Sequence, residues 1–217
     1  LEAHAQEVRA ARRDSTDRLM AAMAETPAVC EHVHLPAQSG SNAVLKRMLR
    51  RYTRETFLEV VARLRAAMPA ITFSTDLIVG FPGETEAQFE ETLSLVAAAA
   101  LDDAYMFRYS VREGTPAVKL KDHVPEDVAA ARLERLIEAV RAQAAQRNMG
   151  RVGTTHEVLV ERPAKRGGFQ LGRTRTNHLV LLDLPADAIG QYHTVRLTGT
   201  TGSTFTGTIV QRELAVL

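Results

Sequence analysis

The sequence predicts an α/β unit built on a parallel sheet, followed by a small all-β module. Up to about residue 150, apolar strand-like runs alternate with segments whose apolar residues recur with the 3.6-residue period of a helix. Beyond residue 153 the helical period ends, and short β-branched runs follow at nearly even spacing between Gly-rich or Pro-containing turns. We therefore expect one unit over residues 1–150 and a second over residues 151–217.

The elements of the first unit follow from apolar periods and helix breakers. The first helix is expected to end before Pro27 and the third before Pro69, while Thr85 and Gln88 form a capping-box pattern that opens another helix. The expected helices cover residues 14–25, 42–49, 55–68, from 85 onward, and 126–149, and the expected strands cover residues 31–36, 71–79 and 104–109. Alternating strands and helices indicate a parallel sheet with right-handed crossovers. Three strands cannot close a (β/α) barrel, so only the second half of such a barrel would be present.

The second unit is predicted from its β-branched runs. They cover residues 155–160, 178–182, 192–198 and 205–210. Four such runs in about 65 residues indicate a small antiparallel barrel or sheet, an architecture that often binds nucleic acids.

Composition narrows the class of protein. The chain has 217 residues, 45% of them hydrophobic and 24% charged, which is typical of a soluble globular protein. No run approaches the roughly 18 apolar residues of a membrane helix, so no membrane partner is expected. Cys30 is the only cysteine, which excludes an internal disulfide and favours a cytoplasmic location. The chain opens at Leu1 without an initiator methionine or a signal pattern, so we expect a piece of a longer protein.

A basic run occupies residues 162–178 and contains no acidic residue. Its five cations are Arg162, Lys165, Arg166, Arg173 and Arg175, interspersed with glycines. We interpret the run as a loop system that contacts RNA phosphates, and substitution of Arg173 and Arg175 would then weaken RNA binding. The alternative is a solvated hairpin edge whose cations discourage aggregation.

Candidate ligand-binding residues follow the first two strands of the first unit. Gln38, Ser39 and Ser41 can offer amide and hydroxyl groups to a ribose or a methionine moiety at the carboxyl edge of the sheet. Ser41 has the alternative role of capping the next helix. Asp76 is a charge inside an apolar strand, so it is either a site residue or the partner of a nearby arginine.

Further candidates lie at the next two strand ends. Gly80 shapes the turn after the second strand, and Glu84 lies at the start of the next helix, where it serves either the site or the helix end. Arg108 and Arg112 flank the end of the third strand, where a guanidinium could hold a carboxylate or a phosphate. For Arg112 the alternative is a surface ion pair with Glu113.

Two other residue types are assigned structural roles. Cys30 precedes an apolar strand and is expected to be a small buried hydrophobe. His32 and His34 lie on one face of a strand without a third ligand nearby, so we expect no metal site there.

Several motifs, in this order along the chain, resemble the radical-SAM methylthiotransferase family. They are His34-Leu35-Pro36-Ala37-Gln38-Ser39-Gly40-Ser41, Met48 with Arg51-Tyr52-Thr53, Ile78-Val79-Gly80-Phe81-Pro82-Gly83-Glu84-Thr85, Tyr109-Ser110-Val111-Arg112-Glu113-Gly114-Thr115-Pro116-Ala117, Val124-Pro125-Glu126 and Gly172-Arg173-Thr174. The His-Leu-Pro-x-Gln-Ser-Gly-Ser form is similar to the MiaB-like tRNA branch of the family.

The resemblance implies a fold, an activity and partners. Residues 1–150 would be the C-terminal half of a (β/α) radical-SAM barrel, and residues 151–217 an OB-like TRAM domain that binds RNA. The enzyme would add a methylthio group to isopentenyladenosine beside the tRNA anticodon, with S-adenosylmethionine as cofactor. Gln38, Ser39, Ser41, Asp76, Gly80, Glu84, Arg108 and Arg112 would be cofactor contacts. The alternatives are the threonylcarbamoyladenosine branch, the ribosomal-protein branch, or a non-catalytic RNA-binding protein.

The chain departs from the family in its cysteines. Family members carry two four-iron four-sulfur clusters on cysteine triplets, and Cys30 alone cannot supply such ligands. We therefore expect the chain to be inactive alone and to partner the missing N-terminal part of the same enzyme.

Overall fold

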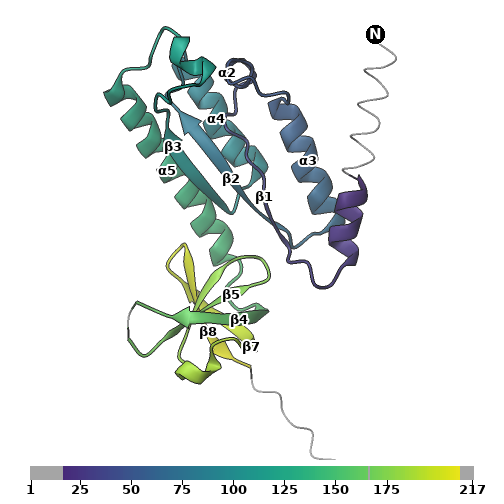
Figure 1. Cartoon of the computed structure of the whole chain (residues 1–217). Helices are drawn as coiled ribbons and strands as arrows, with labels where there is room; N and C mark the ends of the chain where they lie inside the picture. The colour runs from purple at the N-terminus through teal and green to yellow at the C-terminus, as the bar shows by residue number, and fades with distance from the viewer. Residues whose placement is uncertain (1–16, 166, 211–217) are drawn as a thin grey trace, which may run out of the picture.

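The computed structural model describes residues 17–165 and 167–210, which form an α/β unit and a closed β-barrel (Figure 1). In the first unit a three-stranded parallel sheet has the order β1-β2-β3, and helices cover one of its faces. The barrel lies beyond the lower end of the sheet, beside the C-terminal end of the long helix α5. The predicted α/β unit and small barrel are confirmed.

The helices and strands of the first unit lie close to their predicted positions. The strands are β1 His32–His34, β2 Thr72–Val79 and β3 Asp103–Arg108. The helices are α2 Asn42–Arg47, α3 Arg54–Ala67, α4 Glu86–Ala99 and α5 Glu126–Met149, and residues 17–25 are also helical. The capping box at Thr85 is formed, since the Thr85 hydroxyl accepts from the Gln88 N–H while the Gln88 side chain accepts from the Thr85 N–H.

Strand periodicity decides which face of the sheet the helices cover. On β2, Phe73, Leu77 and Val79 point into a core with Phe89 of α4 and Leu136 of α5, and all five are fully buried. The intervening residues of β2 point to the opposite face, which no helix of the described chain covers.

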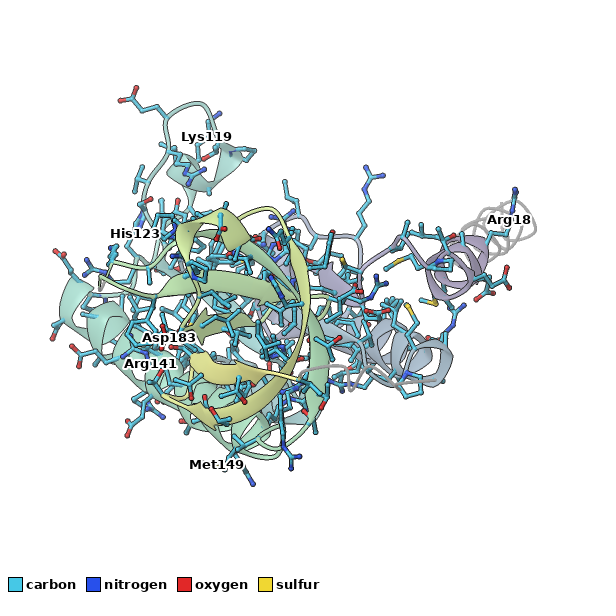
Figure 2. The ribbon with its side chains drawn as sticks, turned by 90° about the horizontal axis from the view of Figure 1, so that it is seen from below. Arg18, Lys119, His123, Arg141, Met149 and Asp183 are labelled. Carbon is cyan, nitrogen blue, oxygen red and sulfur yellow. The ribbon has the colours of Figure 1, made fainter. Side chains whose placement is uncertain are left out.

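The barrel closes in the order β4-β5-β6-β8-β7 around an apolar centre. Its strands are β4 Thr155–Pro163, β5 Gln170–Thr174, β6 Leu179–Leu182, β7 Tyr192–Thr200 and β8 Thr204–Ile209. Its core consists of Val158, Val160, Val180, Leu182, Val195, Leu197 and Phe205. Seen from below, these strands curve around one another in front of the sheet unit (Figure 2).

Strand β5 corrects one prediction. Residues 162–178 were expected to be a loop system, but β5 lies inside this run and pairs with both β4 and β6. Arg173 is therefore a strand residue opposite Leu159.

The two units are joined by direct polar contacts as well as by the chain. Arg175 bonds to Glu31, and Thr72 Oγ1 donates to the Thr176 carbonyl at 2.8 Å. At the end of α5, Asn148 Nδ2 donates to the Gly202 carbonyl at 2.8 Å. None of the helices in the described chain is long and apolar enough to cross a membrane.

Candidate functional site

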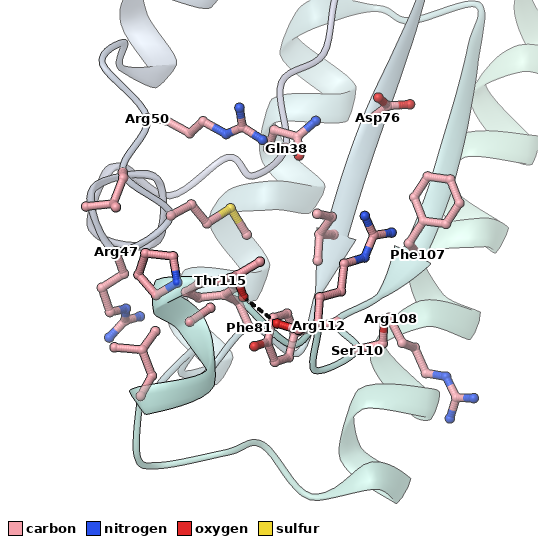
Figure 3. Close-up of a pocket in the computed structure, with 17 residues that line it drawn as sticks. Gln38, Arg47, Arg50, Asp76, Phe81, Phe107, Arg108, Ser110, Arg112 and Thr115 are labelled. Carbon is pink, nitrogen blue, oxygen red and sulfur yellow. Dashed lines mark hydrogen bonds between the residues drawn. The ribbon is translucent and has the colours of Figure 1, made fainter.

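A cavity of about 660 Å³ lies at the carboxyl ends of the three parallel strands (Figure 3). This edge is where open parallel sheets bind ligands, because loops from several strands meet there. Four of the predicted cofactor contacts line the cavity: Gln38, Asp76, Arg108 and Arg112. Ile78, Phe81 and Leu120 add apolar surface.

Gln38 is held in place by main-chain and side-chain bonds. Its N–H donates to the Asp76 carbonyl at 2.8 Å, and its own carbonyl accepts from the Ile78 N–H at 2.9 Å. Its backbone is left-handed, with φ of 65°, and its Oε1 accepts from Arg50 Nη2 at 3.1 Å. These bonds extend the β1 chain alongside β2 and fix the Gln38 amide at the cavity wall.

Asp76 has a histidine partner rather than an arginine. Its Oδ1 lies 3.4 Å from His34 Nε2, and its side chain is 30% exposed. The alternative of an arginine partner was therefore wrong, and Asp76 lines the cavity, where its role as a site residue stays a prediction. The carboxylate can therefore accept hydrogen bonds from a ligand in the cavity.

Arg108 and Arg112 both line the cavity, but the Arg108 guanidinium is directed away from it, toward α5 (Figure 3). Arg108 Nη1 lies 3.3 Å from Glu126 Oε1 at the start of α5, in a solvent-exposed pair. Among the described residues, no ion pair joins Arg112 to Glu113. The Arg112 guanidinium at this edge suits an anionic group such as a carboxylate or a phosphate, and Arg108 as a cofactor contact stays a prediction.

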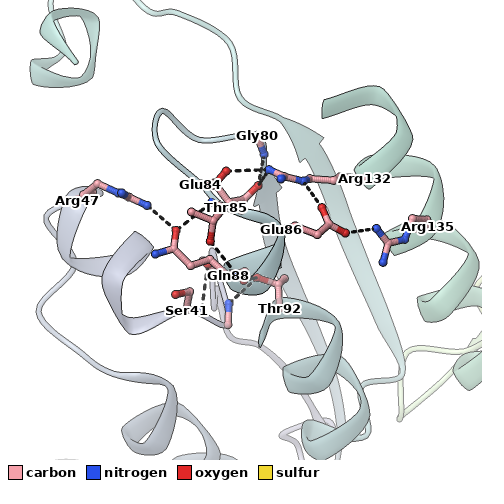
Figure 4. Close-up of polar contacts among 12 residues, drawn as sticks. Ser41, Arg47, Gly80, Glu84, Thr85, Glu86, Gln88, Thr92, Arg132 and Arg135 are labelled. Carbon is pink, nitrogen blue, oxygen red and sulfur yellow. Dashed lines mark hydrogen bonds and ion pairs between the residues drawn. The ribbon is translucent and has the colours of Figure 1, made fainter. Parts of the chain in front are cut away.

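The other four predicted contacts lie outside the cavity lining and make internal bonds (Figure 4). Ser39 Oγ lies 3.3 Å from Thr92 Oγ1 on α4 and accepts from the Ser41 N–H at 3.1 Å. Ser41 is the N-cap residue of α2, but its side chain makes no capping bond. As cofactor contacts, Ser39 and Ser41 stay predictions.

Gly80 and Glu84 form a buried polar cluster with an arginine of α5. Glu84 Oε2 accepts from the Gly80 N–H at 2.7 Å and from Arg132 Nη1 at 3.0 Å, and both charged side chains are almost fully buried. Burial raises the pKa of Glu84, while these two donors lower it by a smaller amount. The cluster fixes the turn after β2 against α5, and as cofactor contacts both residues stay predictions.

Sequence reasoning missed several cavity residues. Tyr109 and Phe81 line the wall with their rings edge to face, centroids 5.0 Å apart, and the Tyr109 hydroxyl is buried without a hydrogen-bond partner among the described atoms. Arg47 and Arg50 reach the cavity from the end of α2. Tyr109 could have been found, because it belongs to a motif that the sequence shows. Arg47 and Arg50 could not, because the position of α2 beside the cavity depends on tertiary packing.

The predicted RNA contacts divide into two groups. Arg162 and Lys165 are exposed on the barrel, and Arg166 lies outside the described residues. Arg173 bonds to Glu161 at 2.8 Å and to the Asn177 side chain at 2.8 Å. Arg175 lies at the junction of the two units, where it bonds to Glu31 and to two carbonyls. Acidic residues outside the run therefore neutralise Arg173 and Arg175.

The structure also bears on Cys30 and the two histidines. Cys30 is exposed, so its expected burial was wrong, because the chain reaches the sheet only two residues later. His32 and His34 both bond to Ser74 Oγ. In the described part of the chain, no group of three or more His, Cys, Asp or Glu residues could hold a metal ion.

Comparisons with known proteins find one matching family profile and several similar sequences. The profile described as Radical SAM superfamily matches residues 7–96. A tRNA-2-methylthio-N(6)-dimethylallyladenosine synthase of Clostridium novyi is 47% identical over 199 residues, which are 91% of this chain and 44% of that protein. The Thermus thermophilus protein of the same name is 52% identical over 154 residues, 71% of this chain and 33% of that protein. This chain is a homologue of these synthases.

Homology to the synthases covers both units but not the whole length of the relatives. The match to the C. novyi synthase covers 91% of this chain, whereas this chain spans about 44% of that synthase. The solved structure titled "Coproporphyrinogen III oxidase (HemN) from Escherichia coli is a Radical SAM enzyme" is 15% identical, with a TM-score of 0.46, over 84% of this chain and 46% of that chain. The predicted resemblance to radical-SAM methylthiotransferases is confirmed by the synthase relatives.

Proposed function

We propose that this chain forms part of a cytoplasmic tRNA methylthiotransferase that adds a methylthio group to isopentenyladenosine next to the anticodon. The observation that carries the proposal is the 47% identity over 91% of the chain to a synthase named for the dimethylallyl form of this nucleoside. Residues 1–150 would be the C-terminal half of a (β/α) radical-SAM barrel, and residues 151–217 a TRAM domain. The cavity at the carboxyl edge supports the proposal, because its polar groups suit the expected cofactor.

The cavity residues fit S-adenosylmethionine. The Asp76 carboxylate suits an amino or ribose group, the guanidinium group of Arg112 suits a carboxylate, and the unpartnered Tyr109 hydroxyl offers a further hydrogen bond. Apolar walls suit the adenine. When bound, S-adenosylmethionine supplies the methyl group and, after reductive cleavage, a deoxyadenosyl radical. This chain would orient the cofactor and keep water from its apolar portion.

The residues of this chain do not fit an iron–sulfur cluster. A four-iron four-sulfur cluster is held by several cysteine thiolates, and the 217 residues contain one, Cys30. We therefore assign this chain to cofactor and RNA binding, and assign the clusters, and with them the activity, to the remaining length of the synthase relatives.

RNA binding is assigned to the barrel. Arg162 and Lys165 are exposed there and have no ion-pair partner among the described residues, so they remain available to phosphates. Arg166 is proposed on sequence grounds alone. Arg173 and Arg175 are proposed as weaker contributors, because each already bonds to a glutamate.

The test is nucleoside mass spectrometry of bulk tRNA from the source organism, with and without the gene that encodes this chain. We expect loss of methylthio-isopentenyladenosine and accumulation of unmodified isopentenyladenosine, reversed when the gene is restored. Loss of the methylthio group from the threonylcarbamoyl derivative instead would assign the chain to that sister branch. An unchanged profile would overturn the tRNA proposal.

A further inference from the structure

The barrel docks on the sheet at the amino ends of the strands, the edge opposite to the cavity (Figure 1). Glu31, which directly precedes β1, pairs with Arg175 of the barrel. Thr72, at the start of β2, donates to the Thr176 carbonyl. Asp102, which directly precedes β3, is linked to the barrel through the end of α5. The docking of the barrel therefore determines where an RNA bound by the barrel lies relative to the cavity.

Apolar packing does not lock this junction. The sheet unit and the barrel have separate apolar cores, and within the described chain no residue belongs to both. Two units of one chain usually move relative to each other unless their interface is large and hydrophobic. Apolar contact is also non-directional, so it selects an orientation only weakly. The orientation of the barrel therefore depends on the polar bonds across the junction, which are directional.

Asp102 lies at the centre of a buried polar cluster at this junction. Its side chain is only 5% exposed. Its Oδ2 accepts from the Phe73 N–H of β2 at 2.9 Å. Its Oδ1 accepts from Arg147 Nε at 3.0 Å and from Arg151 Nη2 at 2.7 Å. One carboxylate thus joins the start of β2 to the last turn of α5 and to the segment that leads into the barrel.

The cluster continues from Asp102 into the barrel. Arg151 Nη1 donates to Asn148 Oδ1 at 3.0 Å, and Asn148 is 3% exposed. Asn148 Nδ2 then donates to the carbonyl of Gly202, in the turn between β7 and β8, at 2.8 Å. This turn lies against α5, since a Cβ at residue 202 would be 3.5 Å from the Ala145 Cβ. A path of hydrogen bonds therefore runs from the sheet to the barrel.

Burial makes this cluster more selective for geometry than stabilising. Removing a carboxylate and a guanidinium from water costs free energy, which their attraction offsets only when the geometry is good and the remaining hydrogen bonds are made. A rotated barrel would leave the buried groups of Arg151 and Asn148 without these partners. The neighbouring Asp103 differs, because it is exposed and its Oδ1 accepts from the Ala104 N–H of the same strand.

We infer that Asp102 is a positioning residue for the RNA. Through Arg151 and Asn148 it fixes the orientation of the barrel, so that an RNA bound there presents its target nucleoside to the cavity. The pair of Arg175 with Glu31 supplies a second anchor. Because the anchors lie at the two edge strands of the sheet, β3 and β1, together they oppose rotation about either one. This inference rests on the proposed function and adds the residues that determine where the RNA is held.

The first test measures the orientation of the barrel in the 217-residue chain. Spin labels are attached at Lys46→Cys on α2 and Thr194→Cys on β7, two exposed positions, in a Cys30→Ser background. Pulsed electron paramagnetic resonance then gives the distribution of distances between the labels. We expect one narrow distribution, which becomes broad when Asp102→Asn or Asn148→Ala is added.

Two comparisons separate positioning from stability. Asp103→Asn is the matched control, since it removes the same charge from the neighbouring exposed residue, and it should leave the distribution narrow. Asn148→Ala leaves the bonds of Asp102 to the sheet and to both arginines in place, so broadening in this variant cannot result from a damaged sheet. Lower stability alone would reduce the folded fraction without changing the distances within it.

The second test measures the consequence for the RNA. Both variants should bind a tRNA transcript nearly as tightly as the unmodified chain, because Arg162 and Lys165 are unchanged. When the gene is returned to the deletion strain with Asp102→Asn or Asn148→Ala, we expect less methylthio product at equal protein level. A displacement of about 1 Å at the reacting groups can lower a rate by about 100-fold. The gene with Asp103→Asn should restore the product fully.

The outcomes separate this inference from the proposed function. Narrow distributions in both Asp102→Asn and Asn148→Ala would overturn the inference, whatever the nucleoside profile. Broad distributions with full restoration of the product would also overturn it, because the orientation of the barrel would then not matter to the target. If gene deletion leaves the nucleoside profile unchanged, the proposed function fails, while broad distributions would still assign the orientation of the barrel to Asp102.

Discussion

Arg175 of the barrel and Glu31 before β1 form an ion pair across the junction of the two units, with Arg175 Nε 3.0 Å from Glu31 Oε2. The guanidinium also donates to the carbonyls of Pro27 and Val29, at 2.8 and 2.6 Å. The hydrogen bond from Arg175 lowers the pKa of Glu31. An arginine from the most basic part of the sequence therefore holds the two units together.

Arg175→Ala should loosen this junction. The substitution removes charge-assisted bonds from a partly exposed site, so we expect a loss of about 1–2 kcal/mol in the free energy of unfolding, measured in urea. Limited proteolysis between residues 26 and 31 should become faster. Arg162→Ala is the control, since Arg162 is exposed on the barrel, and equal behaviour of the two variants would contradict the assignment.

RNA affinity should depend on the exposed cations of the barrel. The double variant Arg162→Ala with Lys165→Ala should lower the slope of log affinity against log salt by about 1.4 to 1.8, since each phosphate contact contributes about 0.7 to 0.9. Filter binding of a tRNA transcript at several salt concentrations measures the slope. A slope equal to that of the unmodified chain would show that neither residue contacts the RNA.

Gly40→Ala should destabilise the first unit. A Cβ at residue 40 would lie 2.3 Å from the Glu91 carbonyl oxygen and 2.5 Å from the Thr92 Cα, both part of the α4 backbone. Overpacking of this kind costs about 1–3 kcal/mol, which thermal unfolding can measure. Gly167→Ala has open space within 4 Å and should change stability by less than about 0.5 kcal/mol. Similar losses of stability in the two variants would show that the close approach of α4 to residue 40 does not cause the destabilisation.

Arg132→Met should be much more damaging than Arg135→Met. Arg132 is 6% exposed and pairs with the fully buried Glu84, so its removal leaves a buried carboxylate without its cation and costs about 3–5 kcal/mol. Arg135 is 45% exposed and pairs with Glu86 and Glu90 at the surface, where a loss below about 1 kcal/mol is expected. Urea unfolding of both variants measures the two losses in free energy of unfolding. Equal losses would show that the Glu84–Arg132 pair contributes no more than a surface ion pair.

The barrel should lose stability in mild acid because of His178. Burial lowers the pKa of His178 from 6.5 to about 4, with smaller contributions from Arg151 and His156 that exceed the opposing effect of Asp102. Between these pH values the unfolded chain binds more protons than the folded one, so the free energy of unfolding falls as the pH drops from 6.5 to about 4. The full effect is at most about 3 kcal/mol and levels off below about pH 4.

His178→Gln isolates this contribution. The variant should show a flatter dependence of unfolding free energy on pH than the unmodified chain across the same window, measured in urea at a series of pH values. Parallel pH curves for the two proteins would assign the acid sensitivity to other groups.

The sequence predicted the elements whose signals are local. The capping box at Thr85 and the breaker Pro69 act within a few residues, so α4 and α3 were placed almost correctly. Strand β5 was missed because Gly172 is a poor strand former by itself and lies in a run rich in glycine and basic residues. Its pairing depends on β4, where a Cβ at residue 172 would lie 2.5 Å from a Val158 methyl carbon.

The candidate site divides in the same way. Gln38, Asp76, Arg108 and Arg112 were found because the carboxyl ends of parallel strands meet at one edge, whatever the side-chain details. The partners of Asp76 and Arg175 were not predictable, since Arg175 and Glu31 are 144 residues apart in sequence. Pairings over such distances depend on how the two units dock. The periodicity of the sequence carries no information about that docking.

Helix α5 extends without interruption from the cavity to the barrel. Its first residue, Glu126, pairs with Arg108 at the cavity, and its penultimate residue, Asn148, bonds to Gly202 of the barrel. With 24 residues at about 1.5 Å each, the helix is about 36 Å long. At about 3.4 Å per stacked base, this length equals roughly ten nucleotide steps. An RNA fragment much shorter than that would engage the cavity or the far end of the helix, but not both at once.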